Sequence, residues 1–324
     1  MSLVEIDNLR VSFGGGKDVV AGISYAIPAG RTLGVVGESG CGKSMTALAL
    51  MGLVPGSGEV SGSLKFEGRE MLGQSTADWR RVRGERVAMV FQEPMSALNP
   101  VMTVGRQIAE VLVLHGESGW RAAEERAVGM LEAVGINSPK ERARAYPHQL
   151  SGGMRQRAMI AMALACEPAL LIADEPTTAL DVTIQAQILD LMLELQERIG
   201  MAIQFISHNL AVVSEVAHEI IVMYAGRIVE RSPADELFAA PLHPYTLGLI
   251  ETLPNPDHRV SRLPVIRGGV PNFDTKMRGC RFADRCPRGD EGCRREEPPL
   301  AELAPAHFVA CFKASPPGAS SPWA

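Results

Sequence analysis

The stretch GESGCGKS at residues 37–44 decides the fold of this chain. It follows RTLGVV at 31–36, an apolar run that predicts a buried strand, and it leads into a helical pattern at 44–53. Glycines in such a loop let successive backbone N–H groups turn inward around phosphate oxygens, and the N-terminus of the next helix adds partial positive charge. The stretch therefore predicts a phosphate-binding P-loop between a strand and a helix.

Two side chains of this loop carry most of the expected chemistry. Lys43 neutralises the terminal phosphates of a bound nucleotide, and the Ser44 hydroxyl binds Mg²⁺. A P-loop alone leaves kinases, GTPases, helicases and transporters open, because a fold does not dictate a function. The residues expected to surround the phosphates are Gly37, Glu38, Ser39, Gly40, Cys41, Gly42, Lys43, Ser44 and Met45.

Composition restricts the class of protein. A chain of 324 residues, 46% of them hydrophobic, predicts about two folding units. The net charge of −5 supplies no basic face for nucleic acid. Apolar runs stay well below the roughly 18 residues that cross a bilayer, and residues 1–7 lack the basic and apolar regions of a secretory signal. We expect a cytoplasmic protein that does not itself span the membrane.

Apolar strand patterns alternate with helical ones over the first 240 or so residues, which predicts an α/β fold with helices flanking a sheet. After about residue 240 prolines, arginines and cysteines dominate, so a domain boundary is expected there, and the tail 314–324 is expected to be disordered. The predicted elements are strands at 86–91, 170–173 and 202–206, helices at 120–134 and 183–200, a hairpin at 219–230, and a helical subdomain over about 95–155.

Two adjacent carboxylates follow one of the buried strands. LLIADE at 170–175 matches the Walker B pattern, in which the strand delivers both acids to the same edge of the sheet. Asp174 is suited to hold Mg²⁺, because a hard cation prefers oxygen ligands. Glu175 is suited to orient and polarise an attacking water, as a general base does in phosphoryl transfer.

The segment LSGGM at 150–154 lies between these two motifs, and with it the chain resembles the ABC ATPase family, whose signature is usually LSGGQ. Met154 departs mildly from that signature. The resemblance implies a RecA-like core with an antiparallel β subdomain and a helical subdomain. It also implies that Ser151, Gly152 and Gly153 face the ATP of a partner subunit, so that hydrolysis requires a closed dimer.

Four further residues match positions that the ABC family uses. Gln92 corresponds to the Q-loop glutamine, a ligand of Mg²⁺ and water, and His208 corresponds to the switch histidine that contacts the γ-phosphate. Asp181 corresponds to the D-loop that crosses to the partner, although an aspartate before a helix is also an N-cap. Phe13 stands where the family places an aromatic ring against adenine, and a core phenylalanine is the alternative.

Several other segments resemble the peptide and nickel importers in particular, namely QEPMSALNP at 92–100, YPHQ at 146–149, HPYT at 243–246 and GVP at 269–271. The resemblance implies a peripheral ATPase on the cytoplasmic face of a bacterial membrane, paired with a second ATPase subunit of different sequence. Two permease subunits and an extracytoplasmic binding protein complete the expected assembly. A nickel or other small-solute importer is the alternative. A soluble ABC ATPase acting on nucleic acid or ribosomes is disfavoured, since the coiled-coil insert, second nucleotide domain or basic face of such proteins is not evident.

Four of the six cysteines fall in the C-terminal region, at Cys280, Cys286, Cys293 and Cys311. Four thiolates can satisfy a tetrahedral Zn²⁺ or an iron–sulfur cluster, and this spacing fits neither the zinc-ribbon nor the ferredoxin pattern. Resemblance to peptide-importer ATPases with the same extension implies a 4Fe–4S cluster. Zinc and free or disulfide-paired thiols are the alternatives, and any metal is expected to pin a segment too poor in apolar residues to fold alone.

Overall fold

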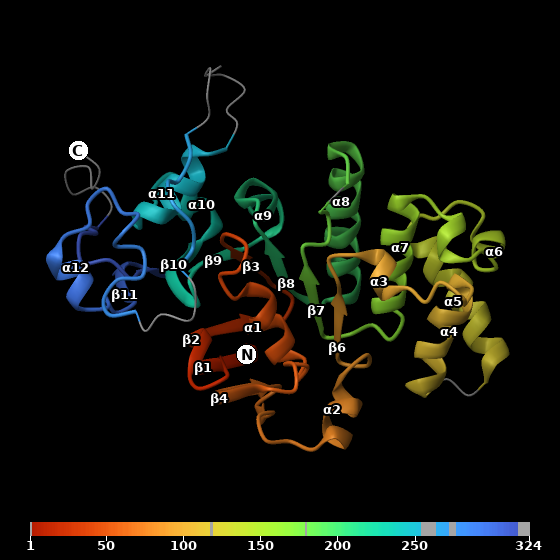
Figure 1. The fold of residues 1–324 in the computed structure, drawn as a ribbon. Helices are drawn as coiled ribbons and strands as arrows, with labels where there is room; N and C mark the ends of the chain where they lie inside the picture. Colours follow the sequence, from red (N-terminus) through yellow and green to blue (C-terminus); the bar gives the residue numbers. More distant parts are fainter. Residues whose placement is uncertain (1, 117–118, 179, 254–263, 272–276, 317–324) are drawn as a thin grey trace. The chain divides into compact units, whose positions relative to one another are not determined.

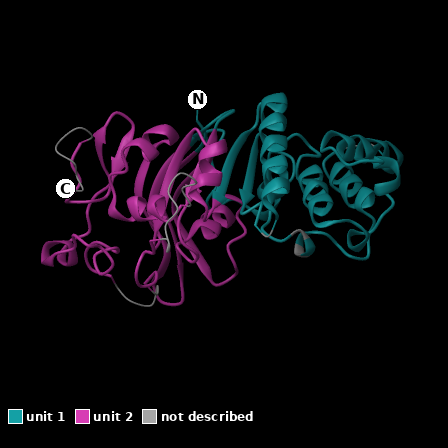
Figure 2. Ribbon diagram, turned by 90° about the horizontal axis from the view of Figure 1, so that it is seen from above, with its two compact units in different colours: residues 1–4, 27–31, 66–206 teal, residues 5–26, 32–65, 207–324 magenta. Residues whose placement is uncertain are grey.

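The computed structural model describes residues 2–116, 119–178, 180–253, 264–271 and 277–316 (Figure 1). Backbone contacts divide the chain into two compact units, coloured separately in Figure 2. Unit 1 comprises residues 1–4, 27–31 and 66–206, and unit 2 comprises residues 5–26, 32–65 and 207–324. The chain crosses between the units several times, so neither is one continuous segment.

Unit 1 is built on three parallel strands, β6 (Val87–Val90), β7 (Leu170–Asp174) and β8 (Ala202–Ser207, the last residue assigned to unit 2). Their register sets Val87 opposite Leu170 and Leu170 opposite Ala202. Every residue of these strands is buried, as expected for a parallel sheet covered on both faces. The strands predicted at 86–91, 170–173 and 202–206 are confirmed to within about a residue.

Helices make up most of the remainder of unit 1. The longest is α8 (Val182–Ile199), which Gly200 ends in the left-handed conformation, as its sequence predicts. Helices α4 (Val104–Leu114), α5 (Trp120–Ala133) and α7 (Gly152–Ala163) pack on one another (Figure 1), and the helices predicted between 95 and 155 are confirmed. The other elements of unit 1 are β5 (Arg69–Glu70), α2 (Thr76–Val82), α3 (Pro94–Ala97), α6 (Pro139–Arg142) and a 3₁₀ turn (Pro147–Gln149).

Unit 2 contains strands of two sheets. In one, β1 (Ser2–Phe13) lies between β2 (Lys17–Pro28) and β4 (Gly58–Phe66), and the residues of these strands at 2–4, 27–28 and 66 are assigned to unit 1. In the other, β3 (Thr32–Val36) pairs in parallel with β9 (Glu219–Tyr224), which forms an antiparallel hairpin with β10 (Arg227–Pro233). The hairpin turn places Ala225 at φ 46° and Gly226 at φ 81°, the two positive angles of a type I′ turn. The predicted hairpin is confirmed.

The helix after the P-loop is shorter than its sequence pattern predicts. Helix α1 (Lys43–Leu50) ends before Gly52, whose φ is 58°. The N–H of Leu53 donates to Leu48 O at 2.8 Å and that of Gly52 to Ala49 O at 3.0 Å, the two bonds of a Schellman motif. The helix therefore stops three residues before the predicted end at residue 53, because a glycine supplies the left-handed turn.

The C-terminal segment joins a sheet of unit 2. Strand β12 (His307–Val309) pairs antiparallel with β10, and β11 (Ala301–Ala304) pairs with β12. The contacts thus divide the chain elsewhere than at residue 240, and the boundary expected there stays a prediction. The expected disorder of the tail falls largely on 317–324, outside the described residues. The helices of unit 2 besides α1 are α9 (Leu210–Val216), α10 (Ala234–Ala239), α11 (Pro244–Glu251) and α12 (Glu291–Arg295).

Candidate nucleotide site

The loop between β3 and α1 requires glycine at two of its positions. Gly37 has φ 156° and Gly42 has φ 104°. A Cβ at Gly37 would lie 2.2 Å from Met223 O, and one at Gly42 would lie 2.7 Å from Val19 O. Because both oxygens belong to backbone that cannot swing aside, only glycine fits at either position. The close packing of unit 2 around the loop thus imposes the glycines that the motif displays.

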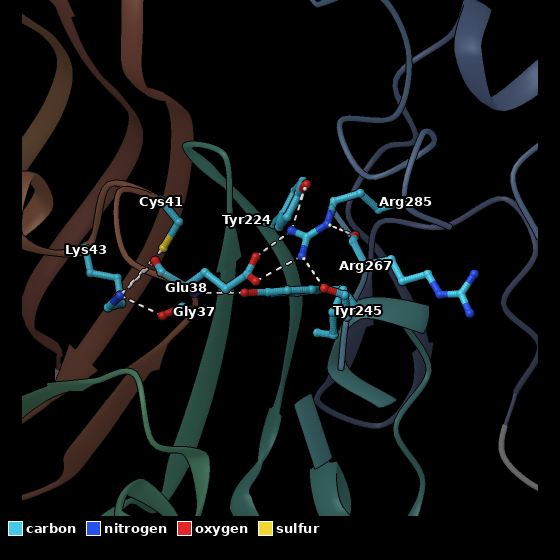
Figure 3. A network of polar contacts seen from close by, with 9 residues as sticks. Gly37, Glu38, Cys41, Lys43, Tyr224, Tyr245, Arg267 and Arg285 are labelled. Carbon is cyan, nitrogen blue, oxygen red and sulfur yellow. Dashed lines mark hydrogen bonds and ion pairs between the residues drawn. The ribbon is translucent and has the colours of Figure 1, made fainter. Parts of the chain in front are cut away.

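The Lys43 side chain turns back toward this loop and binds its backbone. Its side chain is almost fully buried, and Nζ donates to Gly37 O at 2.7 Å and to Glu38 O at 3.1 Å (Figure 3). The first backbone bond of the following helix runs from the N–H of Thr46 to Gly42 O. The N–H groups before Thr46 therefore project from the helix N-terminus, where the helix dipole favours an anion.

The donor set fits a nucleotide triphosphate with Mg²⁺. Ser39, Gly40 and Ser44 are exposed on the loop, so their hydroxyls and backbone N–H groups can be reached by a ligand. Cys41 is fully buried instead, and burial raises the pKa of its thiol, so only its backbone faces the phosphates. The Ser44 hydroxyl would be among the groups that hold Mg²⁺, which would supply positive charge to offset that of the phosphates.

Two other predicted residues of unit 2 lie at strand ends. Phe13 ends β1 and is half-buried, with its ring close to Gly58, so part of the ring face is accessible. His208 is exposed and directly follows β8. The next residue, Asn209, caps α9 by accepting from the N–H of Ala211 at 3.0 Å. Both placements are compatible with contact to a nucleotide.

In unit 1 the Walker B carboxylates stand at the end of β7. Asp174 is the last residue of the strand and is buried. Glu175 adopts a positive φ of 48°, and its N–H donates to Ile206 O at 2.9 Å. A left-handed angle at a glutamate stores backbone strain, which is typical of functional positions. The two acids are therefore turned into different surroundings although they are neighbours in sequence.

Glu175 receives two side-chain hydrogen bonds within unit 1. Gln92 Nε2 donates to Glu175 Oε2 at 3.2 Å, and Thr178 Oγ1 donates to the same oxygen at 3.0 Å. Gln92 is exposed just after β6. The structure thus brings the predicted Q-loop glutamine and the predicted general base together. Thr178 was not identified as a site residue from the sequence. Its position three residues after Glu175 is the local feature that could have indicated this hydrogen bond.

Signature residue Ser151 begins helix α7. Its hydroxyl is exposed and accepts from the N–H of Met154 at 3.3 Å, an N-cap bond. Gly152 is exposed, and a Cβ at Gly153 would lie 3.1 Å from the Ile184 side chain of α8, a tight contact that a shift of that side chain would have to relieve. The signature helix and α8 therefore approach closely in unit 1.

Asp181 caps α8, because its carboxylate accepts from the N–H of Ile184 at 2.9 Å. The N-cap interpretation of this residue is confirmed, and its role toward a partner subunit stays a prediction. Gln156, which the sequence did not suggest, is buried in α7 and donates from Nε2 to Pro176 O beside the Walker B acids. No periodic or spacing signal distinguishes it from a core position.

The predicted nucleotide residues are shared between the two units. The residues in unit 2 are Phe13, Gly37, Glu38, Ser39, Gly40, Cys41, Gly42, Lys43, Ser44, Met45 and His208. The residues in unit 1 are Gln92, Ser151, Gly152, Gly153, Asp174, Glu175 and Asp181.

The four C-terminal cysteines line one small pocket of unit 2, with a volume of about 10 Å³. Burial, with smaller contributions from the other three thiols, raises the pKa of Cys280 to about 11. Within the described ranges, however, no group of three or more His, Cys, Asp or Glu side chains is arranged to hold a metal ion. The pocket would admit about one water-sized sphere. The four thiols have the chemistry of metal ligands, but their side chains are not arranged to coordinate a metal ion.

A P-loop, a Walker B strand end and a helix beginning at the LSGG serine together define an ATP-hydrolysing subunit of the ABC class. The ABC transporter family model matches residues 20–178, and the model of the oligopeptide/dipeptide transporter C-terminal region matches residues 229–293. The chain belongs to the family of ABC transporter ATP-binding subunits that includes the peptide transport proteins.

Curated relatives and solved structures agree with this assignment. The chain is 50% identical to a probable peptide ABC transporter ATP-binding protein of Sinorhizobium fredii, over 97% of this chain and 95% of the relative. It is 48% identical to the dipeptide transport ATP-binding protein DppD of Escherichia coli, over 96% of each. A solved structure of cbiO1 from Clostridium perfringens, part of an ABC transporter complex, superposes with a TM-score of 0.65 at 26% identity, over 74% of this chain and 91% of that one. In the part of the chain that the structure describes, the helices are too short or too polar to cross a bilayer.

Proposed function

We propose that this subunit powers the import of dipeptides or oligopeptides. The observation that carries the proposal is the match of residues 229–293 to the oligopeptide/dipeptide transporter C-terminal region, in a chain 46–50% identical to proteins named for peptide transport. The family model that matches the ATPase core is named for ABC transporters in general, whereas the model that matches the C-terminal region is named for oligopeptide and dipeptide transporters. A nickel or other small-solute importer of the same group is the alternative.

The proposed assembly follows from the same relationship. Two permease subunits carry the cargo across the membrane, this chain lies on their cytoplasmic face in a bacterium, and an extracytoplasmic binding protein delivers the cargo. A second ATPase subunit of different sequence completes the motor. The negative net charge supports a partner other than nucleic acid.

Each site residue has a proposed role in ATP hydrolysis. Lys43 and the P-loop N–H groups bind the phosphates, while Ser44, Gln92 and Asp174 hold Mg²⁺. Glu175 orients the attacking water and His208 contacts the γ-phosphate. Phe13 stacks on the adenine. Ser151, Gly152, Gly153 and Asp181 act on the nucleotide of the partner subunit. In domain terms, residues 1–240 form the nucleotide-binding domain, with its helical subdomain at about 95–155, and 241–324 form the C-terminal extension.

Purification of the intact membrane complex tests the cargo. Its subunits are identified by mass spectrometry, and the complex is reconstituted in vesicles with its binding protein. Di- and oligopeptides are expected to stimulate ATP hydrolysis and to accumulate inside the vesicles at the expense of ATP. Stimulation by Ni²⁺, with no response to peptides, would transfer the assignment to the nickel importers.

We also propose that Cys280, Cys286, Cys293 and Cys311 hold a metal centre, with a 4Fe–4S cluster as the first candidate and Zn²⁺ as the alternative. The four thiols around one pocket support it, although their side chains do not form a ligand set as they stand. Chain purified without oxygen is expected to be brown, to absorb near 400 nm and to contain about four irons and four labile sulfides. Stoichiometric zinc without iron supports the alternative, and thiols titrating with no metal would exclude both.

A further inference from the structure

A residue of the P-loop is tied to the cysteine-bearing segment of unit 2. The Glu38 carboxylate receives two hydrogen bonds from the Arg285 guanidinium, from Nη1 to Oε2 at 2.5 Å and from Nη2 to Oε1 at 3.0 Å (Figure 3). This is the bidentate geometry that makes an arginine–carboxylate pair strong and directional. Arg285 immediately precedes Cys286, so the pair joins the phosphate loop to the C-terminal segment.

The Arg285 guanidinium is held in place independently of Glu38. Its Nε donates to Arg267 O at 2.8 Å, Nη2 donates to Ile266 O at 3.3 Å, and Nη1 donates to the Tyr224 hydroxyl at 3.3 Å. Together with the two bonds to the carboxylate, these contacts use all five N–H donors of the side chain. Its side chain is only 6% exposed. The charge is therefore prepositioned, and little conformational entropy is lost in meeting Glu38.

Aromatic rings form the surroundings of this guanidinium. Its carbon lies 5.6 Å from the centre of the Tyr224 ring and 5.8 Å from that of Phe282, distances at which a cation is attracted to the ring face. Tyr224, Tyr245 and Phe282 also pack on one another, with centroids 4.8 to 5.4 Å apart. Burial of the guanidinium beside these rings strengthens its pairing with Glu38, whose own side chain is 30% exposed.

Two further contacts brace the same loop. The Tyr245 hydroxyl accepts the backbone N–H of Glu38 at 2.8 Å, so both the backbone and the side chain of Glu38 are held. Arg281, beside Cys280, donates to Ala225 O in the β9–β10 turn, and the next residue, Gly226, donates its N–H to Cys41 O at 2.9 Å. Arginines next to two of the four cysteines thus reach the P-loop, one directly and one through a turn.

Glu38 places a negative charge in a loop whose task is to bind polyphosphate. An unneutralised carboxylate there would repel a triphosphate, and its movement would displace the Glu38 carbonyl to which Lys43 donates. Arg285 opposes both effects, since it neutralises the charge and holds the residue. The loop can then present its N–H groups with no electrostatic penalty.

From this geometry we propose that Arg285 is a positioning residue for ATP binding, and that the cysteine-bearing segment sets the nucleotide affinity of the P-loop through it. The inference rests on ATP binding by this family and not on the identity of the cargo. It therefore stands or falls separately from the peptide assignment. It requires no metal at the cysteines.

The test measures nucleotide affinity in the full-length chain and ATP hydrolysis in the assembled transporter. Arg285→Ala is expected to raise the Kd for a fluorescent ATP analogue about tenfold and the KM for ATP similarly, with kcat changed less than twofold. Arg285→Lys, which keeps the charge, is expected to recover most of the loss. Arg294→Ala is the matched control, because Arg294 flanks Cys293 in the same segment but pairs with exposed Asp284. The Kd of this variant for the ATP analogue is expected to lie within twofold of that of the unmodified chain.

The double variant E38Q/R285A separates charge compensation from packing. Removal of both charges is expected to restore at least half of the affinity lost in Arg285→Ala, on a logarithmic scale, whereas a packing defect would not be relieved. Arg285→Gln, which conserves much of the side-chain volume, replaces Arg285→Ala if the latter does not fold. A folded Arg285→Ala or Arg285→Gln chain with Kd within twofold of the unmodified chain overturns the proposal, as does a double variant that binds no better than Arg285→Ala.

Discussion

Gln92 Nε2 donates to Glu175 Oε2 at 3.2 Å, so a residue two positions after β6 reaches the acid that directly follows β7. The bond follows from the parallel pairing of β6 and β7, which sets Val90 opposite Ala173. The C-terminal ends of both strands therefore lie at the same edge of the sheet in unit 1. A conformational change at Gln92 would consequently alter the hydrogen bonding of the Glu175 carboxylate, which is proposed to act on water.

Glu175→Gln is expected to retain ATP binding and to lower hydrolysis by roughly 10²- to 10⁴-fold, because the amide can still accept from Thr178 and Gln92 but cannot take a proton from water. Steady-state ATPase assays and equilibrium nucleotide binding check this, and accumulation of an ATP-bound dimer is expected. Glu194→Gln, an exposed change on α8, serves as the control. Retained turnover would show that another group handles the water.

Lys43→Ala is expected to weaken ATP binding at least about tenfold, because it removes the one buried ammonium inside the phosphate loop. Isothermal titration with Mg²⁺ and ATP measures the loss. Lys65→Ala, at an exposed position of β4, is the charge-matched control and is expected to bind normally. Unchanged affinity and turnover in Lys43→Ala would contradict the P-loop assignment.

Glu230→Ala is expected to lower the free energy of unfolding by about 3 kcal/mol, because it leaves buried donors without an acceptor. The fully buried Glu230 carboxylate accepts from the N–H groups of Leu242 at 2.6 Å and His243 at 2.9 Å, and it lies 2.7 Å from His307 Nε2. Urea unfolding of the full chain measures the change. Glu219→Gln, which breaks a more exposed pair with Arg231, is expected to cost less than about 1 kcal/mol. Equal costs in the two variants would refute the buried-acceptor explanation.

Gln156→Leu is expected to lower kcat and to cost about 1–3 kcal/mol of stability, because Pro176 O beside the Walker B acids loses its buried donor. ATPase kinetics and thermal unfolding are measured together. Gln187→Ala, on the exposed face of α8, is the control for loss of a glutamine. A Gln156→Leu enzyme with normal kcat would show that the bond between α7 and the Walker B loop serves stability alone.

The parts of the fold that sequence reasoning anticipated are those whose signals are local. Parallel strands appear as short, fully apolar runs, α8 repeats apolar residues at helical spacing up to Gly200, and the β9–β10 turn is marked by Ala225 and Gly226. Sequence reasoning missed residues whose role depends on a partner far along the chain, because the local pattern around them carries no signal. Gln156 is a polar residue on a buried helix, and its acceptor lies 20 positions away.

The sequence by itself determined where phosphate chemistry can occur, because a strand, a glycine loop and a helix are adjacent in the chain and because Glu175 follows directly on its strand. Only the tertiary structure decided what holds that loop. Arg285 lies 247 positions from Glu38, and His307 lies 77 positions from Glu230. Periodicity reports which face of an element is buried, whereas such pairs arise from the packing of β9, β10, α11 and the C-terminal segment into one body, which no local pattern encodes.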